Sequence, residues 1–563
     1  MFTIFGLSRI KLGAVAGAML LLAACGSPAT SSGGTSDKSG VTGSASEAPV
    51  KGGSLTFAAD TEPVSFDIHV SSQDITGAIL RNVFDSLIAE DASGTFHPWL
   101  AESWEVAPDL KSYTFRLRRG VTFHDGTPFD AEAVKVNFDR IADPATKSQL
   151  ASNLLGPYTG TTVVDPHTVK VEFSAPFAPF LQAASTAYLG FYSPKTIAAN
   201  AATLGSGGPV GVGTGPFVFT AYTKGQEAVL TRNDAYAWAP KTGGHTGPAY
   251  LDKLTVRFLP EASVRVGSLN SRQIDVAAAI PPANAKTVEA NTNLSLLKTD
   301  YPGGNYSIYL NTSKPPLNDE KVRKALQRGI DIDTNVKALY FGQFKRAWSP
   351  LAPTTPGYNA ALENSWPYDP VLAGKLLDEA GWTGRDADGY RTKDGKRLII
   401  DWPLLPAQYV RDQRDILGQA FQADLKKIGV EVLRPQADIG TYLERVYGGK
   451  ADLADYSWSR FEPDVLWLLF NGASKPQKGG QNATFLNDPD LTAWTDQGRA
   501  TLDETVRKDV YGKTQQRAVD LALVIPVYTQ SQVLGLGKQV RGLTLDANAW
   551  PLFYDVWLGK TAQ

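Results

Sequence analysis

Cysteine is almost absent from this chain of 563 residues, and the single one is Cys25. One cysteine cannot form a disulfide within the chain or supply a cysteine-rich metal site. Histidine is also scarce, and the five histidines are scattered without the spacing that a zinc site requires. The sequence therefore predicts no disulfide framework and no metal site built by the protein, and we expect no cofactor.

An excess of charge of one sign is lacking too. Lys and Arg number 55 and Asp and Glu 57, which gives a formal net charge of −2. No basic field is available to attract nucleic acid or an anionic lipid surface, so we expect neither as a partner. The motifs His-Glu-x-x-His and Gly-x-Ser-x-Gly are missing, which argues against an enzyme. A hydrolase with paired carboxylates stays as an alternative, because two acidic side chains can meet in any fold.

A hydrophobic run long enough to span a membrane comfortably is missing as well. The apolar stretch Leu12–Ala24, which follows Arg9 and Lys11, has the length and flanks of an export signal. It ends in Leu22-Ala23-Ala24-Cys25, which resembles the lipobox of bacterial lipoproteins. The resemblance implies that the signal peptide 1–24 is removed and that Cys25 carries a diacylglyceryl group, a two-chain anchor that holds stably. We therefore expect an extracytoplasmic protein that is anchored to the cell membrane by lipidated Cys25 and does not span it.

Apolar residues larger than valine are absent from Gly26 to Val50, where Ser, Gly, Thr, Ala and Pro dominate. Such a composition cannot bury enough surface to fold, so residues 25–50 are predicted to form the lipidated cysteine and a flexible linker. The remaining chain is too long for one ordinary core, and its hydrophobic share of 43% is that of a soluble globular protein. We expect two or three lobes.

The most informative stretch runs from Pro98 to Arg140. Apolar residues alternate with polar ones over 104–106 and 113–117, which predicts a β-hairpin with its turn at Pro108-Asp109. Asp130 is predicted to cap a helix whose apolar residues recur at helical spacing. His124 beside Asp125 is either an acid–base pair or a structural hydrogen-bonding residue, and its place between a strand and a turn favours the structural role.

The run LAESWEVAPDL followed by YTFRLRRGVTFHDGTPFDAEAVKVNFDRI closely resembles the extracellular solute-binding proteins of family 5. These are receptors of ABC importers for oligopeptides, dipeptides, nickel chelates and some sugars and opines. Similar segments follow in the same order: GVGTGPFVFTAY at 211–222, PPLNDEKVRKAL at 315–326 and ALVIPVY at 522–528. The resemblance thus extends from about Lys51 to the C-terminus.

The resemblance implies an α/β, two-lobed, periplasmic-binding-protein-like clamp of type II, with an extra subdomain in the first lobe. Strand, helix and strand patterns over 254–277 also favour a parallel βαβ unit. We expect lobe I to comprise 51–85, 207–302 and 526–563, the extra subdomain 86–206, and lobe II 303–525. A helix is predicted over about 76–87.

Candidate ligand contacts are also implied by the resemblance. The segment after the first strand lines the cleft in the family, which suggests Glu62 and Val64, and Tyr306 opens the second lobe. In peptide-binding members an aspartate shortly before a Glu/Asp-Pro pair meets the ammonium group of the ligand, but here Ser459 stands in its place and Arg460 follows. Arg460 either favours an anionic ligand group or is solvated or ion-paired. Trp458 is either a stacking surface or part of the core.

We therefore expect the substrate-binding lipoprotein of an ABC importer, a monomer that captures a solute between two closing lobes and passes it to permease subunits. A peptide is the first choice for the ligand. An oligosaccharide, an opine or a metal chelate on the same fold is the alternative, a secreted lipoprotein hydrolase is a remote one, and a sensing or chaperone role also stays open.

Overall fold

The computed structural model describes residues 47–476 and 480–560. The predicted signal peptide, Cys25 and most of the predicted linker lie outside the described residues. In the part that the structure covers, no helix combines the length and the apolar character needed to cross a bilayer.

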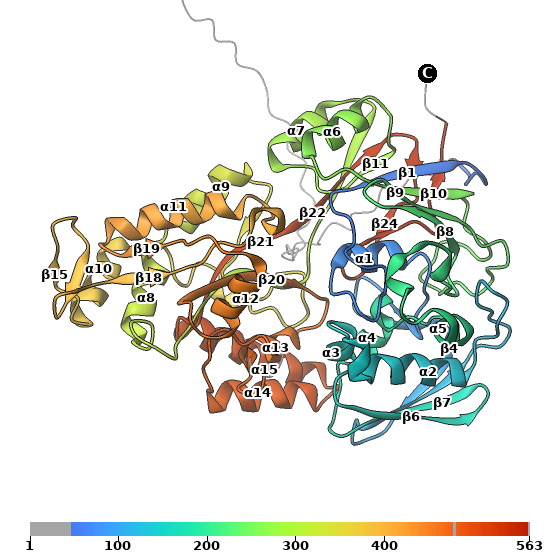
Figure 1. The fold of residues 1–563 in the computed structure, drawn as a ribbon, viewed down its shortest axis with the longest axis horizontal. Coiled ribbons are helices and arrows are strands. Elements are labelled where there is room, and N and C mark those ends of the chain that lie inside the picture. The colour runs from blue at the N-terminus through green and yellow to red at the C-terminus, as the bar shows by residue number, and fades with distance from the viewer. Residues whose placement is uncertain (1–46, 477–479, 561–563) are drawn as a thin grey trace, which may run out of the picture. The chain divides into compact units, whose positions relative to one another are not determined.

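A seven-stranded mixed sheet forms the core of lobe I (Figure 1). Its strands follow one another in the order β12 (Leu294–Asp300), β22 (Ser531–Gly537), β11 (Val276–Ala277), β1 (Ser54–Ala59), β10 (Lys253–Phe258), β9 (Glu227–Arg232) and β8 (Phe217–Thr223). Strand β1 lies between β11 and β10 and runs parallel to both. The predicted βαβ unit is confirmed, with α6 (Ala262–Asn270) as its crossover helix and β1 inserted between its two strands.

The extra subdomain is built on a four-stranded antiparallel sheet. Its strands are β4 (Ala101–Val106), β5 (Ser112–Leu117), β7 (Thr168–Phe173) and β6 (Tyr158–Asp165), in that order. The predicted hairpin is confirmed, since Trp104 lies opposite Phe115 in the β4–β5 pair. The predicted cap is confirmed as well, because Asp130 Oδ1 accepts a hydrogen bond from the Ala133 backbone N–H at 2.9 Å at the start of α2 (Ala131–Ala142).

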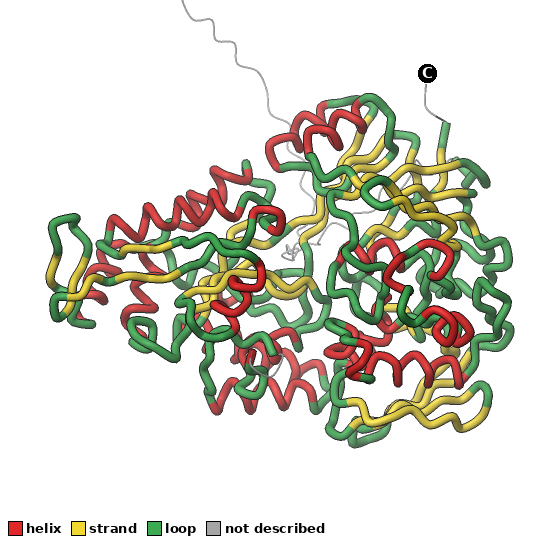
Figure 2. Tube along the Cα trace, viewed as in Figure 1, coloured by secondary structure: helices red, strands yellow, loops and turns green. Residues whose placement is uncertain are grey.

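Lobe II contains a second four-stranded sheet, in the order β14 (Lys345–Arg346), β21 (Val524–Thr529), β13 (Gly303–Leu310) and β20 (Leu453–Ser459). Figure 2 shows helices on both sides of the lobe II strands. One side carries α11 (Arg414–Lys427), and the other carries α14 (Pro489–Arg499) and α15 (Glu504–Asp520), which pack against each other.

The remaining elements are short. The helices are α1 (Asp74–Leu80), α3 (Ala151–Leu155), α4 (Phe180–Ser185), α5 (Pro194–Asn200), α7 (Pro282–Ala290), α8 (Glu320–Gly329), α9 (Ile332–Tyr340), α10 (Pro370–Glu379), α12 (Ile439–Tyr447) and α13 (Val465–Phe470). The strand pairs and triplets are β2 (Ile88–Glu90) with β3 (Phe96–Pro98), β15 (Gly384–Arg385) with β16 (Arg391–Lys393) and β17 (Lys396–Arg397), β18 (Ile399–Asp401) with β19 (Glu431–Leu433), β23 (Val540–Arg541) with β26 (Trp557–Leu558), and β24 (Thr544–Leu545) with β25 (Pro551–Leu552).

The chain passes twice between the sheets of the two lobes. The first crossing joins β12 to β13 at residues 301–302, and the second joins β21 to β22 at Gln530. The predicted end of lobe II at residue 525 falls inside β21, which pairs with β13 of lobe II as far as Tyr528. Two short crossings are a connection that allows rigid lobes to move about a hinge.

Helix α1 ends earlier than the predicted span of 76–87, at Leu80. The Asn82 side chain donates to the carbonyl oxygens of Ala78 and Ile79 at 3.2 and 3.0 Å. These carbonyls lie in the last turn of the helix, and the Ile79 carbonyl also accepts from the Asn82 backbone N–H at 3.3 Å. An amide that satisfies them favours termination, which the apolar spacing of the sequence does not reveal.

Candidate functional site: a cavity between segments of the two lobes

The end of strand β20 is held at close range by a glycine in β13. Gly303 has a φ of +96°, and a Cβ placed on it would lie 2.2 Å from the Trp458 carbonyl oxygen and 2.4 Å from the Arg460 nitrogen. Only glycine fits this conformation and this approach. The backbone of residues 458–460 is therefore fixed against the central strand of lobe II.

A cavity of about 250 Å³ lies where this segment faces lobe I. Lobe II contributes Tyr447, Tyr456, Ser457, Trp458, Ser459 and Arg460. Lobe I and its extra subdomain contribute Ser72, Asp74, Leu150, Leu154, Thr186, Tyr188, Asn548 and Trp550. The segments touch beside the cavity, where the Phe461 backbone N–H donates to Asn548 Oδ1 at 3.2 Å.

A second, smaller cavity of about 100 Å³ lies beside Arg81, Glu90 and Asp546. All the residues that line it belong to lobe I and its extra subdomain. A movement of the two lobes cannot open or close such a cavity, so the larger one is the candidate ligand site.

Aromatic side chains with fixed orientations form the walls of the larger cavity. Tyr456 stacks on Tyr309 with 4.3 Å between ring centroids, and its hydroxyl donates to the Gln481 carbonyl at 2.7 Å. Tyr188 packs edge-on against Trp550 with 5.7 Å between centroids. Such rings offer flat apolar faces to a ligand at little entropic cost, because they are ordered before it binds.

Arg460 is the positive charge of the cavity. The residue is 8% exposed, and its Nε and Nη2 atoms are buried without a hydrogen-bond partner among the described residues. The neighbouring acids are already paired, Glu462 with Arg507 and Asp464 with Arg499 at 2.8 Å. Burial lowers the pKa of Arg460, while the two acids oppose that shift. Its charge is therefore buried, and no carboxylate of residues 47–476 or 480–560 pairs with it directly.

Trp550 supplies another unused donor. Its indole Nε1 is buried without a hydrogen-bond partner in the described structure, and the residue is 4% exposed. The benzo end of the ring lies against Gly77, where a Cβ would approach within 2.5 Å. Buried polar groups in native proteins are almost always satisfied, so this indole N–H is an exception within the cavity wall.

Asp74 is the negative charge of the cavity. It lies in the first turn of α1, is half-buried, and accepts no hydrogen bond on its carboxylate from the described residues. Burial raises the pKa of this carboxyl group, and Arg411 opposes the shift. A cation close to Asp74 would stabilise its charged form.

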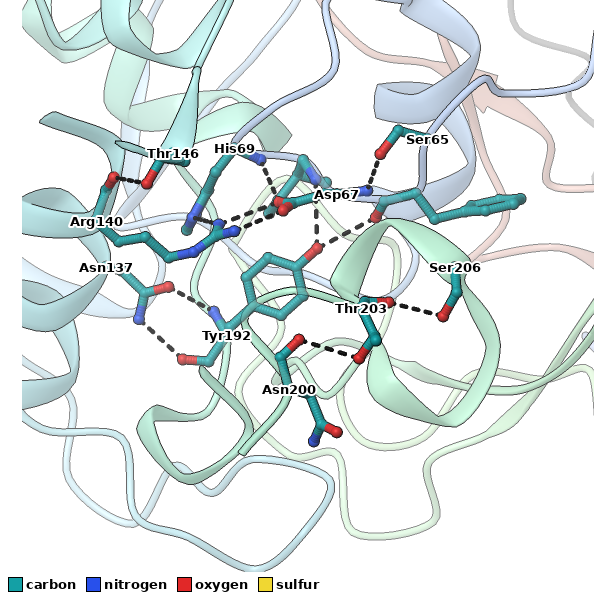
Figure 3. Close-up of polar contacts among 12 residues, drawn as sticks. Ser65, Asp67, His69, Asn137, Arg140, Thr146, Tyr192, Asn200, Thr203 and Ser206 are labelled. Atoms are coloured by element: carbon teal, nitrogen blue, oxygen red, sulfur yellow. Dashed lines mark hydrogen bonds and ion pairs between the residues drawn. The ribbon is translucent and has the colours of Figure 1, made fainter. Parts of the chain in front are cut away.

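The segment that leads into Asp74 is anchored to helix α2 by a buried ion pair. Arg140 donates from Nη1 and Nη2 to the two carboxylate oxygens of Asp67 at 3.1 and 2.6 Å (Figure 3). The same Nη1 lies 2.9 Å from His69 Nδ1, which must accept, so His69 Nε2 donates to the Gly190 carbonyl at 2.9 Å. Burial lowers the pKa of His69 to about 4, and the ring is neutral at pH 7. This network fixes the cavity wall on the lobe I side.

Comparison with known proteins gives the family. Residues 95–480 match the model of the bacterial extracellular solute-binding proteins, family 5 Middle. The chain belongs to this family. It is 30% identical over 490 residues to the glutathione-binding protein GsiB of Escherichia coli (strain K12), which covers 85% of this chain and 89% of that protein. It is 28% identical over 500 residues to the heme-binding protein A of Haemophilus influenzae, covering 84% and 87%.

Solved structures agree with this membership. NikA from Brucella suis, in complex with Fe(III)-EDTA, has a TM-score of 0.78 and 26% identity and covers 90% of this chain and 100% of that one. The periplasmic binding protein DppA from Helicobacter pylori, in complex with the peptide STSA, has a TM-score of 0.76 and 25% identity over 91% and 99%. The expected type II, two-lobed α/β fold is confirmed, and the family 5 chain is a solute-binding protein.

The structure separates the predicted contact residues into two groups. Trp458, Ser459 and Arg460 line the cavity of this family 5 protein. Glu62 does not, because its carboxylate accepts from the Tyr222 hydroxyl and the Gly225 N–H, each at 2.6 Å. Val64 is 83% exposed and lies elsewhere on the surface of lobe I.

Tyr306 lies in the core of lobe II at 1% exposure, and its hydroxyl donates to Asp455 Oδ2 at 2.7 Å. His124 fits the structural role. Its Nδ1 accepts a hydrogen bond from the Gly213 backbone N–H, so its Nε2 carries the proton and donates to the Gly215 carbonyl at 3.0 Å. Trp458 lines the cavity and also packs against the lobe II core.

Sequence reasoning missed the whole lobe I wall, including Asp74, Tyr188, Asn548 and Trp550. These residues come from segments that are hundreds of positions apart. Their only local signal was the generous aromatic content of the chain, which does not distinguish a ligand wall from a core.

Proposed function

We propose that this family 5 protein is the substrate-binding lipoprotein of an ABC importer. It captures one small solute in the cavity between residues 456–460 and the α1 wall, and it delivers the solute to the membrane permease. The carrying observation is the aromatic cavity itself, lined by segments of two lobes that are joined by two short crossings.

A short peptide is the ligand class that we propose first. Support comes from relatives named for dipeptides, di- and tripeptides and glutathione. The volume of about 250 Å³ lies just below the usual range of ~300–1,000 Å³ for ligand pockets, which favours a small solute over a long one. A sugar, an opine or a metal chelate is the competing class.

The anchor and the assembly state belong to the same proposal. Lipidation of Cys25 tethers a monomer to the outer face of the cell membrane, and the linker lets the folded body reach the permease. The ligand stabilises the closed arrangement of the lobes only by the difference between its binding free energies to the closed and the open arrangement. A shift of the closed-to-open population ratio from 1:99 to 99:1 needs a difference of about 5.5 kcal/mol.

Native mass spectrometry of the full chain, purified without denaturation, tests the proposal. We expect one small molecule per chain, released at higher collision energy and identified by fragmentation. A peptide mass supports the first ligand class, whereas a sugar, opine or chelate mass keeps the receptor function and overturns the peptide. No bound solute after exposure to cell extract would contradict the receptor function.

Two substitutions of Trp458 test whether the solute binds in this cavity. Trp458→Ala removes an aromatic wall and should release the solute, whereas Trp458→Phe keeps a ring and should retain most of it. Equal retention by both variants would place the solute elsewhere.

A further inference from the structure

The extra subdomain contacts lobe II at a place away from the two chain crossings. The Ala178 backbone N–H, just before α4, donates to the Arg499 carbonyl oxygen at 2.7 Å. Arg499 is the last residue of α14, and carbonyl groups in the last turn of a helix lack partners further along that helix. A backbone donor of the extra subdomain therefore satisfies a backbone acceptor of lobe II.

The Arg499 side chain adds a second contact across the same boundary. Its guanidinium lies over the Phe177 ring, with 5.5 Å between Cζ and the ring centroid. Phe177 is buried in the core of the extra subdomain, so its ring is a fixed surface. A guanidinium over a ring face is attracted by the electrons of the ring, more strongly where water is excluded. Phe177 and Ala178 thus hold both the side chain and the backbone of one arginine.

The same arginine is connected to the wall of the larger cavity. Its Nε and Nη2 atoms each donate to one carboxylate oxygen of Asp464 at 2.8 Å. Asp464 is buried and follows the cavity-lining residues 458–460 by four positions. A bidentate pair of this kind fixes the orientation of both partners. The contact of Arg499 with the extra subdomain is therefore linked to the segment that lines the cavity.

Phe461 makes two further contacts between lobe II and the rest of the protein. Its backbone N–H donates to Asn548 Oδ1 of lobe I at 3.2 Å. Its ring lies against Gly94 of the extra subdomain, where an added Cβ would lie 3.3 Å from Cε1 of the ring. The boundary between the lobes is thus closely packed on both sides of the segment that holds Asp464.

The acids at this boundary do not oppose the contact. Burial raises the pKa of Glu90 in the extra subdomain well above its ordinary value, and the negative charge of Glu462 in lobe II raises it further. The neutral form of Glu90 is therefore favoured, while the charge of Glu462 is paired with Arg507. Repulsion between the two sides is relieved by both effects.

The contact of Arg499 lies away from the hinge. In Figure 1, α14 lies at the bottom of lobe II, well below β21 and β22, which are joined by the second crossing. A contact at a distance from the hinge breaks when rigid lobes swing apart and forms again when they close.

We propose that Phe177 and Ala178 of the extra subdomain and Arg499 of lobe II form a clasp, which is made only in the closed arrangement and holds the lobes together at a distance from the hinge. This inference rests on the proposed closure of the lobes and gives the extra subdomain a role in it. Because the clasp lowers the free energy of the closed arrangement, a solute has to supply less binding free energy to populate it. The three clasp residues do not line the larger cavity, so they act on solute binding only through the position of the lobes.

Hydrogen–deuterium exchange of the full chain as purified, read residue by residue by mass spectrometry, tests the clasp. The Phe461 amide reports lobe opening, because its acceptor belongs to lobe I. The Trp467 amide is the internal reference, because it donates to the Asp464 carbonyl within lobe II at 2.9 Å. An amide that opening sets free exchanges in proportion to the population of the open arrangement.

Two variants weaken the clasp from the side of the extra subdomain. Ala178→Pro removes the N–H donor, and the loss of one buried hydrogen bond should make the Phe461 amide exchange about fivefold faster. Phe177→Leu removes the ring but keeps an apolar side chain, and it should accelerate the same amide about two- to fivefold. The Trp467 amide should keep its wild-type rate in both variants.

Phe173→Leu is the matched control. It makes the same change in the same core, at a ring that packs against Tyr113 and Phe180 of the extra subdomain, and it should leave the Phe461 amide unchanged. Wild-type exchange of the Phe461 amide in the clasp variants overturns the inference, and so does an equal acceleration by Phe173→Leu or of the Trp467 amide. If Ala178→Pro does not fold, Phe177→Leu decides alone.

Failure of the receptor function gives a different result. The exchange measurement needs no added solute, so it decides about the clasp even when native mass spectrometry finds no bound molecule. A bound solute together with wild-type exchange in the clasp variants keeps the receptor function and overturns only the clasp.

Discussion

The neutral, buried His69 should make the stability of the protein depend on pH. Its Nδ1 accepts from Arg140 and the ring is fully buried, so its pKa is lowered from 6.5 to about 4, first of all by burial, while Asp67 opposes the shift. The unfolded chain therefore binds a proton at this histidine that the folded chain does not bind. The free energy of unfolding should fall as the pH decreases from about 7 to about 4, and the loss levels off below the folded pKa.

The magnitude follows from the two pKa values. Each pH unit between them changes the free energy of unfolding by about 1.4 kcal/mol, and His69 alone should cost about 2 kcal/mol between pH 7 and pH 5. His124 has its pKa lowered to about 4 by burial and acts in the same direction. Buried acids such as Asp85, whose pKa is raised to about 7 by burial, act in the opposite direction. The contribution of His69 to the pH dependence must therefore be obtained as the difference between the wild type and a variant without this histidine.

Urea unfolding of the wild type and of His69→Gln at pH 7, 6 and 5 measures this difference. The variant loses hydrogen bonds and should be less stable at pH 7, but its deficit should shrink by about 2 kcal/mol at pH 5 because glutamine does not titrate. The neighbouring core variant Ile68→Val should lose a similar amount of stability at every pH. A deficit of His69→Gln that stays constant between pH 7 and pH 5 would refute the reasoning.

Three further predictions concern other parts of the protein. Asp464→Asn breaks a buried pair with Arg499 and should lower the free energy of unfolding by about 3 kcal/mol in urea titrations, more than the exposed Asp165→Asn. Gly303→Ala places a Cβ against the backbone of residues 458–460 and should cost more than ~2 kcal/mol and weaken solute binding; wild-type stability would show that β20 can move away. Cys25→Ser should shift the protein from the membrane fraction to the soluble fraction, and retention in the membrane would contradict the lipid anchor.

Elements whose signals are local could be predicted from the sequence. The β4–β5 hairpin follows from period-two alternation, and the start of α2 follows from Asp130, whose side chain satisfies a backbone N–H three residues later. The end of α1 could not be predicted, because it depends on the side chain of Asn82 turning back onto two carbonyl groups. The insertion of β1 between β10 and β11 is equally a matter of tertiary pairing.

The sequence by itself determined the family, the type II fold and part of the lobe II wall of the candidate site, because residues 458–460 are contiguous at the end of strand β20. Only the tertiary structure brought Asp74 and Trp550 to the same cavity, since they lie 476 positions apart and belong to no common motif. It also decided the state of Arg460. Whether an arginine is solvated, paired or buried without a partner depends on the surrounding side chains, and here the neighbouring acids are held by two other arginines.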